Sequence, residues 1–199
     1  MTKLGLICCT ALILAVAAAL AVDSGTTATA PTPKCGIERW PVKTLADPDA
    51  PRISLTPKRT TIAKLRRRKV VVGIGGARGI GTERTLFRVE ASLVEFKLEL
   101  DRDIHLVIAD PSTGKTMIAE FPQKSCTHGA LPGTRTPMEK ARVALVLACG
   151  FPPNSAFHRI TGTATIDGVG FFDVLHGQAG VAPNGIELHP VLRFVGRCS

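Results

Sequence analysis

The sequence predicts an all-β domain with one helix, in the order strand–strand–strand–helix–strand–strand. Two observations lead to this prediction. Several segments between residues 84 and 194 alternate apolar and polar residues, a period that is typical of half-buried strands. One segment, residues 136–149, instead repeats its apolar residues at the spacing of an amphipathic helix.

The first strand is expected to be long and bulged. Within TLFRVEASLVEFKLEL, residues 85–100, the alternation runs up to Leu93 and then resumes one residue out of phase at Val94. A slip of one residue inside a strand is typical of a β-bulge, which bends the strand so that it can join two sheets.

Turns separate the strands that follow. Asp101–Asp103 is expected to form a tight turn before a strand over 104–108, and DPSTGK a second turn before a strand over 117–121. The last two strands are expected over about residues 159–172 and 186–194. In the last strand, the even-numbered residues from Ile186 to Leu192 should face one way and the odd-numbered residues from Glu187 to Arg193 the other.

The helix is expected to begin at TPME, residues 136–139, where a capping box coincides with a proline at the first helical position. Gly150 should end it. This order of elements, with a bulged first strand, is that of an OB-fold, a five-stranded Greek-key barrel. The sequence therefore predicts an OB-fold-like five-stranded barrel (β-β-β-α-β-β).

The N-terminal 21 residues have the pattern of a signal peptide. Lys3 precedes an apolar run from Leu4, and the run ends in the small-x-small pattern of Ala19–Ala21. We expect cleavage there, with a retained anchor as the alternative, and no transmembrane span after cleavage. A flexible leader (22–34), an N-terminal arm with basic and Gly-rich segments (35–83) and the barrel domain (84–199) would follow. The protein is thus expected to be secreted or periplasmic.

Cleavage leaves four cysteines, and an even number in an exported chain predicts two disulfides. Four cysteines allow three pairings. Cys126 and Cys149 bracket the helix, while Cys35 and Cys198 bracket the whole folded region. We therefore expect the nested pairs Cys126–Cys149 and Cys35–Cys198.

A long loop with glycines, two histidines, two amides and two carboxylates is expected between the last two strands, within DVLHGQAGVAPNGIELHP, residues 173–190. In an OB-fold, the loops joining strands one to two and four to five flank the usual ligand face. The sequence therefore predicts a rim of eight residues: Asp103, His105, Asp173, His176, Gln178, Asn184, Glu187 and His189. Two interpretations stay open, in which these residues bind a ligand or hydrogen-bond one another to hold the loop down.

An enzymatic alternative starts from His176, Asn184 and His189, whose residue types match those of an HNH nuclease site. The protein would then be a metal-dependent phosphodiesterase or nuclease, with a divalent metal as its cofactor; no other cofactor is expected. The spacing is far shorter than in that family. A structural envelope protein without a small ligand is a third alternative.

The chain carries a net charge of +9, and seven of its cations fall between residues 58 and 69. A polyanion or an envelope surface could bind there by charge, chiefly through five residues: Lys64, Arg66, Arg67, Arg68 and Lys69. A solvated basic arm is the other interpretation. Aromatic residues, which supply stacking platforms for single-stranded nucleic acids, make up only 5% of the chain.

Several blocks resemble a group of exported bacterial proteins of unassigned activity: ERWPVKTLADPDA, TTIAKL, FKLELDRDIHLVIADPSTGKTMIAEFP and ITGTATIDGVGFFDVLHGQAGVAPNGIELHPVL. The resemblance covers nearly the whole mature chain and implies secretion and a bacterial origin. It implies no activity. The function we expect is that of a disulfide-stabilised binding or interaction module with its site at the predicted rim.

Overall fold

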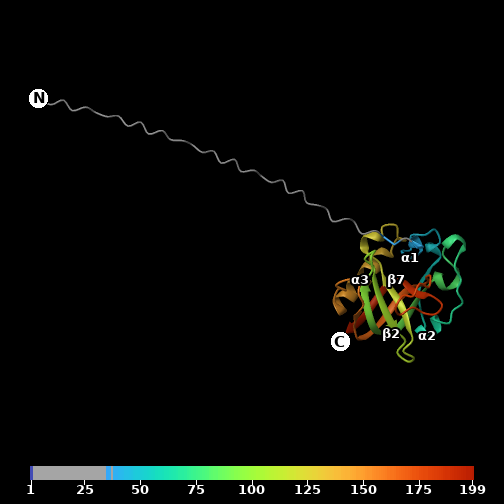
Figure 1. Cartoon of the computed structure of the whole chain (residues 1–199). Helices are drawn as coiled ribbons and strands as arrows, with labels where there is room; N and C mark the ends of the chain where they lie inside the picture. Colours follow the sequence, from blue (N-terminus) through green and yellow to red (C-terminus); the bar gives the residue numbers. More distant parts are fainter. Residues whose placement is uncertain (2–34, 37) are drawn as a thin grey trace. The chain divides into compact units, whose positions relative to one another are not determined.

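The computed structural model describes residue 1, residues 35–36 and residues 38–199. The predicted signal peptide (1–21) and leader (22–34) therefore lie outside the described residues, apart from Met1. From residue 35 onward the described chain belongs to one compact unit (Figure 1). Within this described part, no helix has the length and apolarity needed to span a membrane.

Five strands close into a barrel. In sequence order they are β2 (Thr85–Leu98), β3 (Ile104–Ala109), β4 (Thr116–Phe121), β6 (Gly162–Phe172) and β7 (Ile186–Cys198). They pair in the closed order β2-β3-β4-β7-β6-β2, and every pair is antiparallel except β4 with β7. Helix α3 (Arg135–Cys149) lies between β4 and β6 in the sequence. The predicted OB-fold-like barrel and its element order are confirmed.

The remaining elements are short and lie mainly in the N-terminal arm. They are α1 (Trp40–Lys43), η1 (Ala50–Arg52), β1 (Ser54–Arg59), α2 (Ile62–Leu65), η2 (Ile74–Gly76), η3 (Gly81–Arg84), η4 (Lys124–Cys126) and β5 (His158–Arg159). β1 and β5 extend the sheet by pairing with β2.

The predicted bulge is present in β2. The register between β2 and β3 shifts between Leu93 and Glu95, where the phase of the sequence slips. Residues 86–92 of β2 pair with β6, and residues 92–98 pair with β3. The bend allows a single strand to contribute to both sides of the barrel.

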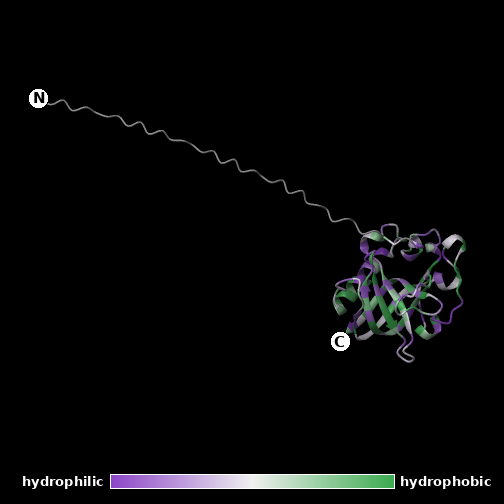
Figure 2. Cartoon of the chain, in the orientation of Figure 1, coloured by the Kyte–Doolittle hydropathy of each residue, from purple (hydrophilic) through white to green (hydrophobic). Residues whose placement is uncertain are grey.

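Apolar side chains of the barrel strands fill the core. Figure 2 shows hydrophobic stretches along these strands. The N-terminal arm also takes part, because Ile62 and Leu65 of α2 are fully buried in the same cluster. Helix α2 is therefore part of the core and does not lie only on the surface. A second, smaller cluster joins Leu45 and Ile53 of the arm to Leu86 and Val169 of the barrel.

The start of α3 differs from the expected one. The helix begins at Arg135 with Thr134 as its N-cap, and no side chain caps it. Pro137 is tolerated because the first amides of a helix have no intrahelical partner. Glu139 does not form a capping box but pairs with Lys124 and Arg135. Gly150, with φ of 82°, ends the helix as predicted.

The disulfides join Cys35 to Cys126 and Cys149 to Cys198, so the predicted nested pairing is wrong. The direction of α3 explains the difference. Its 15 residues extend over about 22 Å at 1.5 Å per residue, which carries Cys149 away from Cys126. At its end Cys149 meets the end of β7, whereas Cys126 binds the start of the N-terminal arm.

The predicted alternation of the last strand holds only for its first part. Ile186 and Leu188 belong to the barrel core, but farther along Val191 and Phe194 also do. The register between β6 and β7 shifts twice near Gly168, so the inward-facing set changes from even to odd residues and back. The strand also continues to Cys198 rather than ending near residue 194.

Candidate functional site

Four polar side chains lie on the outside of the barrel, over β3, β4 and β7. Each alternates with residues of the core, as His105 does between Ile104 and Leu106. Successive side chains of a strand point to opposite faces. The outward-facing set is His105, Glu120, Glu187 and His189.

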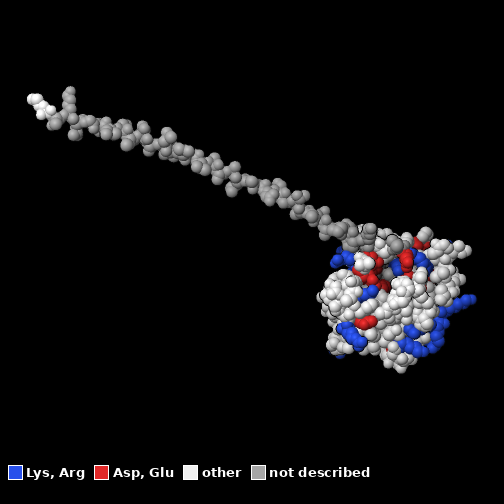
Figure 3. All heavy atoms as spheres, in the orientation of Figure 1, with Lys and Arg blue, Asp and Glu red and all other residues white. Residues whose placement is uncertain are grey.

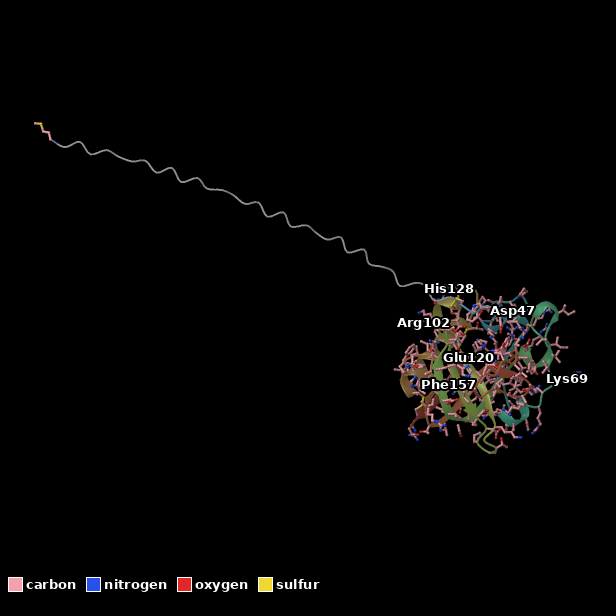
Figure 4. All side chains as sticks on the ribbon, viewed as in Figure 1. Asp47, Lys69, Arg102, Glu120, His128 and Phe157 are labelled. Carbon is pink, nitrogen blue, oxygen red and sulfur yellow. A yellow bond between two sulfur atoms is a disulfide. The ribbon has the colours of Figure 1, made fainter. Side chains whose placement is uncertain are left out.

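The loop between β6 and β7 and the segment with α1 cover this outer face. The carbonyl oxygen of Ala179, in the loop, lies 3.3 Å from Nε2 of His105. Nζ of Lys43, in α1, lies 3.4 Å from Oδ1 of Asp173 at the start of the loop. As a result, all four outward-facing side chains belong to buried residues. Figure 3 shows acidic and basic side chains close together in the upper part of this face, and Figure 4 labels Glu120 near the middle of the folded part.

One part of this cluster is a set of three residues, Glu99, His105 and Glu120, which we call the triad. Nδ1 of His105 lies 2.9 Å from Oε1 of Glu120 and 3.2 Å from Oε1 of Glu99. The β3–β4 pairing sets His105 directly opposite Glu120. Burial lowers the pKa of His105, but the two carboxylates outweigh it and raise this pKa to about 10. His105 is therefore an imidazolium held between two carboxylates at neutral pH.

The other part, which we call the His189 site, consists of His189, Asp103 and Glu187. Nε2 of His189 lies 3.8 Å from Oδ2 of Asp103, and Nδ1 lies 3.8 Å from Oε2 of Glu187. Both distances are too long for hydrogen bonds. Both ring nitrogens and Oδ2 of Asp103 are buried, and none has a hydrogen-bond partner within the described part of the chain.

Neighbouring groups fix the walls of the His189 site. The other carboxylate oxygen of Asp103 accepts a hydrogen bond of 2.7 Å from the amide of Gln123. The ring of Phe171 packs edge-on against His189, with centroids 5.7 Å apart, and Lys43 lies over that same ring. The side chain of His189 is thus held between an aromatic ring and two carboxyl groups.

Burial dominates the electrostatics of the His189 site. It raises the pKa of Asp103, and Asp101 and Glu120 raise it further. Burial likewise raises the pKa of Glu187 well above its usual value, with Glu120 and Asp173 adding to the effect. The pKa of His189 is lowered well below its usual value by burial. The site therefore presents a neutral imidazole beside carboxyl groups that resist ionisation.

Five of the eight predicted rim residues come together in this cluster: Asp103, His105, Asp173, Glu187 and His189. The other three lie in the loop, where Gln178 and Asn184 bond through their side chains and His176 through its backbone amide. Oε1 of Gln178 accepts from the amide of His176 at 3.1 Å, and Nε2 of Gln178 donates to Val174 at 2.9 Å. The side-chain amide of Asn184 donates to the carbonyl oxygens of Leu65 and Arg68, each at 3.0 Å.

The residues of the nuclease alternative take separate positions. His176 is exposed in the loop, the amide of Asn184 is bonded to α2, and His189 is buried on the barrel. No hydrogen bond joins any two of them among residues 38–199. The three side chains therefore have separate environments and form no common hydrogen-bonded set in this part of the chain.

Sequence reasoning missed Glu99, Glu120 and Lys43. For Glu120 a signal exists, because a hairpin centred on DPSTGK pairs residue 105 with residue 120. Glu99 precedes the predicted turn and could have been added to the rim on that ground. Lys43 gives no such signal, since tertiary contacts alone set the path of α1.

The basic segment is partly used inside the protein. Arg66 donates to the carbonyl oxygen of Thr116, and the guanidinium of Arg68 lies 4.8 Å from the centroid of the Phe87 ring. The other three predicted polyanion-binding residues are exposed, and Figure 4 shows one of them, Lys69, at the edge of the molecule: Lys64, Arg67 and Lys69.

In the comparisons with known proteins, no family model, curated protein or solved structure matches this chain.

The cluster itself offers two kinds of chemistry. The His189 site combines hydrogen-bond donors and acceptors in a buried setting. The triad concentrates negative charge around one imidazole, and imidazole with carboxylates is a donor set that suits divalent metals.

Proposed function

We propose that this protein is an exported binding module that holds a small polar ligand at the His189 site. One observation carries the proposal: both ring nitrogens of His189 are buried, and neither has a hydrogen-bond partner in the described chain. Leaving a buried polar group unpaired costs about 1–3 kcal/mol. Buried polar groups in folded proteins are nearly always paired, so an unpaired one calls for a specific explanation.

The chemistry of the site defines the kind of ligand. A neutral imidazole donates one hydrogen bond and accepts another, and a protonated carboxyl group does the same. Lys43 adds an ammonium group, although Asp173 already pairs with it. A ligand with hydroxyl or amide groups would satisfy these atoms without bringing a second buried charge.

Entry of a ligand requires the loop over residues 173–185 to move. Glycines at 177, 180 and 185 all have positive φ, so the loop depends on conformations that few other residues adopt. The exposed segment around His176 is held mainly by bonds within the loop itself. This part of the loop can therefore open without breaking the barrel.

The extracytoplasmic location that we propose agrees with two features. The two disulfides are of the kind that persist in oxidising compartments. The N-terminal sequence has the pattern of a secretory signal, and several blocks resemble those of exported bacterial proteins.

Thermal melts in the presence of small sugars, polyols and amides test the proposal. We expect at least one probe to raise the melting temperature of the wild-type protein and of the His128→Leu control, whose histidine is exposed. The same probe should have no effect on His189→Leu. A probe that stabilises His189→Leu as much as the control, or a panel with no stabilising probe, would contradict it.

A further inference from the structure

We infer that the triad of Glu99, His105 and Glu120 is a binding site for a divalent transition-metal ion such as Zn²⁺. The three side chains come from β3, from β4 and from the segment that follows β2. One donor atom from each lies within 4.8 Å of the others. This inference goes beyond the His189 site and does not depend on it.

The spacing of the donor atoms is slightly shorter than that in the coordination sphere of zinc. Ligand atoms at about 2.1 Å from a tetrahedral Zn²⁺ lie roughly 3.4 Å from one another. Nδ1 of His105 lies 2.9 Å and 3.2 Å from the nearest oxygens of Glu120 and Glu99. A small movement of the carboxylates would therefore open the space for the ion. Three protein ligands would leave a fourth position for water or another ligand.

An unpaired atom points to a missing partner in this triad. Oε2 of Glu120 is buried and has no hydrogen-bond partner among residues 38–199, and the residue is only 7% exposed. Its other oxygen, Oε1, contacts His105. A metal ion bound by the carboxylate would satisfy Oε2 or draw it into the coordination sphere.

The orientation of His105 also suits a metal ligand. Its Nε2 faces the carbonyl oxygen of Ala179 at 3.3 Å. Metal-binding histidines usually donate their second ring N–H to a carbonyl or a carboxylate, which fixes the tautomer and directs the free nitrogen at the metal. With Nε2–H donating to Ala179, loss of the Nδ1 proton would leave an Nδ1 lone pair directed at the two glutamates.

Two cations compete with the metal. A proton on Nδ1 of His105 now bridges the two carboxylates, and the metal has to displace it. Nζ of Lys97 lies 3.0 Å from Oε1 of Glu99. The Lys97 ammonium also lies 4.8 Å from the centroid of the Phe157 ring, so it can stay over this ring while Glu99 turns to the metal. We therefore expect Lys97→Met to bind the metal at least as tightly as the wild type.

The donor set selects among metals. One imidazole nitrogen with carboxylate oxygens suits Zn²⁺ and other first-row divalent ions, whereas Ca²⁺ takes six to eight oxygen ligands. A buried site with three protein donors cannot supply that number. We expect Zn²⁺ and Co²⁺ to bind and Ca²⁺ not to bind.

Calorimetric titration of the full-length, tag-free protein with ZnCl₂ after chelator treatment tests the inference. We expect one Zn²⁺ per chain, and a loss of affinity of at least about 100-fold in Glu99→Gln and Glu120→Gln, which remove ligands. Glu95→Gln is the matched control, because Glu95 lies on β2, the strand that leads to Glu99, but is not part of the triad. It should bind like the wild type. Bound Co²⁺ should give a visible absorption band that His105→Gln abolishes.

Two variants, Glu99→Gln and His189→Leu, keep the outcome clear. Glu99 is a third exposed, so Glu99→Gln should fold even if Glu120→Gln and His105→Gln do not. His189→Leu should bind Zn²⁺ with unchanged affinity, which separates the triad from the proposed ligand site. Absence of saturable Zn²⁺ binding by the wild type, or equal affinity in Glu99→Gln and Glu95→Gln, would overturn the inference.

Discussion

Nε2 of His189 and Oδ2 of Asp103 lie 3.8 Å apart, and neither atom has a hydrogen-bond partner among the described residues. A direct hydrogen bond would require these two atoms to be closer by nearly an ångström. At this distance Oδ2 of Asp103 and Nε2 of His189 are both buried, and they do not form a hydrogen bond with each other. This arrangement favours binding over a purely structural role, in which the two groups would satisfy each other.

The loop residues should behave differently from His189 when they are changed. Asn184→Ala removes two hydrogen bonds to the carbonyl oxygens of Leu65 and Arg68, and we expect it to lower the free energy of unfolding by about 1–3 kcal/mol. His176→Ala removes an exposed side chain and should change it by less than about 0.5 kcal/mol. Urea denaturation of both variants measures the difference. Equal losses in the two variants would contradict the structural role of Asn184.

Glu187→Gln should make stability less dependent on pH. Burial, with Glu120 and Asp173, raises the folded-state pKa of Glu187 above 4.5. The carboxyl group then ionises more easily in the unfolded chain, so its contribution to stability is fully present below pH 4.5 and is lost as the pH rises. The loss is about 1.4 kcal/mol per pH unit where only the unfolded chain is ionised.

We therefore expect the stability of Glu187→Gln relative to the wild type to increase between pH 5 and pH 8. The lowered pKa of His189 gives stability the opposite dependence on pH. Because both proteins contain His189, the difference in stability between them reports on Glu187 alone. Glu38→Gln, at an exposed position, is the control and should follow the wild type at each pH. A constant difference across this range would show that Glu187 ionises in the folded protein as easily as in the unfolded chain.

Peptide mapping without reduction should recover Cys35–Cys126 and Cys149–Cys198. The loops they close span 91 and 49 residues, for which chain entropy predicts roughly 4–5 kcal/mol of stabilisation each. Replacing Cys35 and Cys126 by serine should also speed hydrogen exchange of the amides in α1, which carries Lys43. Replacing Cys149 and Cys198 should leave exchange in α1 unchanged. A Cys126–Cys149 peptide would contradict the pairing.

The two classes of basic residue should separate in stability measurements. Arg66→Gln and Arg68→Gln each remove an internal contact and should lower the free energy of unfolding by about 1 kcal/mol. Lys64→Gln and Arg67→Gln, at exposed positions, should not. If all four variants melt alike, the internal contacts of Arg66 and Arg68 contribute nothing measurable.

Most strands of the barrel could be predicted from the sequence, because apolar and polar residues alternate along them. The phase slip between Leu93 and Val94 locates the bulge, and the alternation around His105 locates β3. The start of α3 was misplaced because a capping pattern does not ensure that the cap forms. The helix instead begins one residue before Thr136.

Long-range contacts explain the features that local patterns could not give. The disulfide partner of Cys149 depends on where α3 ends relative to β7, and the burial of Ile62 depends on the path of the N-terminal arm. The position of Lys43 beside Asp173 depends on that path as well. The loop sequence indicated the right part of the barrel, yet it did not distinguish His189, which is buried, from His176, which is exposed.

The free energy of unfolding of His189→Leu, compared with the wild type and with His128→Leu, tests the central claim most directly. Replacing an unpaired buried imidazole by an apolar group of similar size removes the cost of its unsatisfied nitrogens. We predict that His189→Leu is as stable as the wild type or more stable, by up to about 2 kcal/mol. A decrease of more than about 2 kcal/mol in the free energy of unfolding would contradict the account. It would show that the imidazole stabilises the fold, as a purely structural residue does.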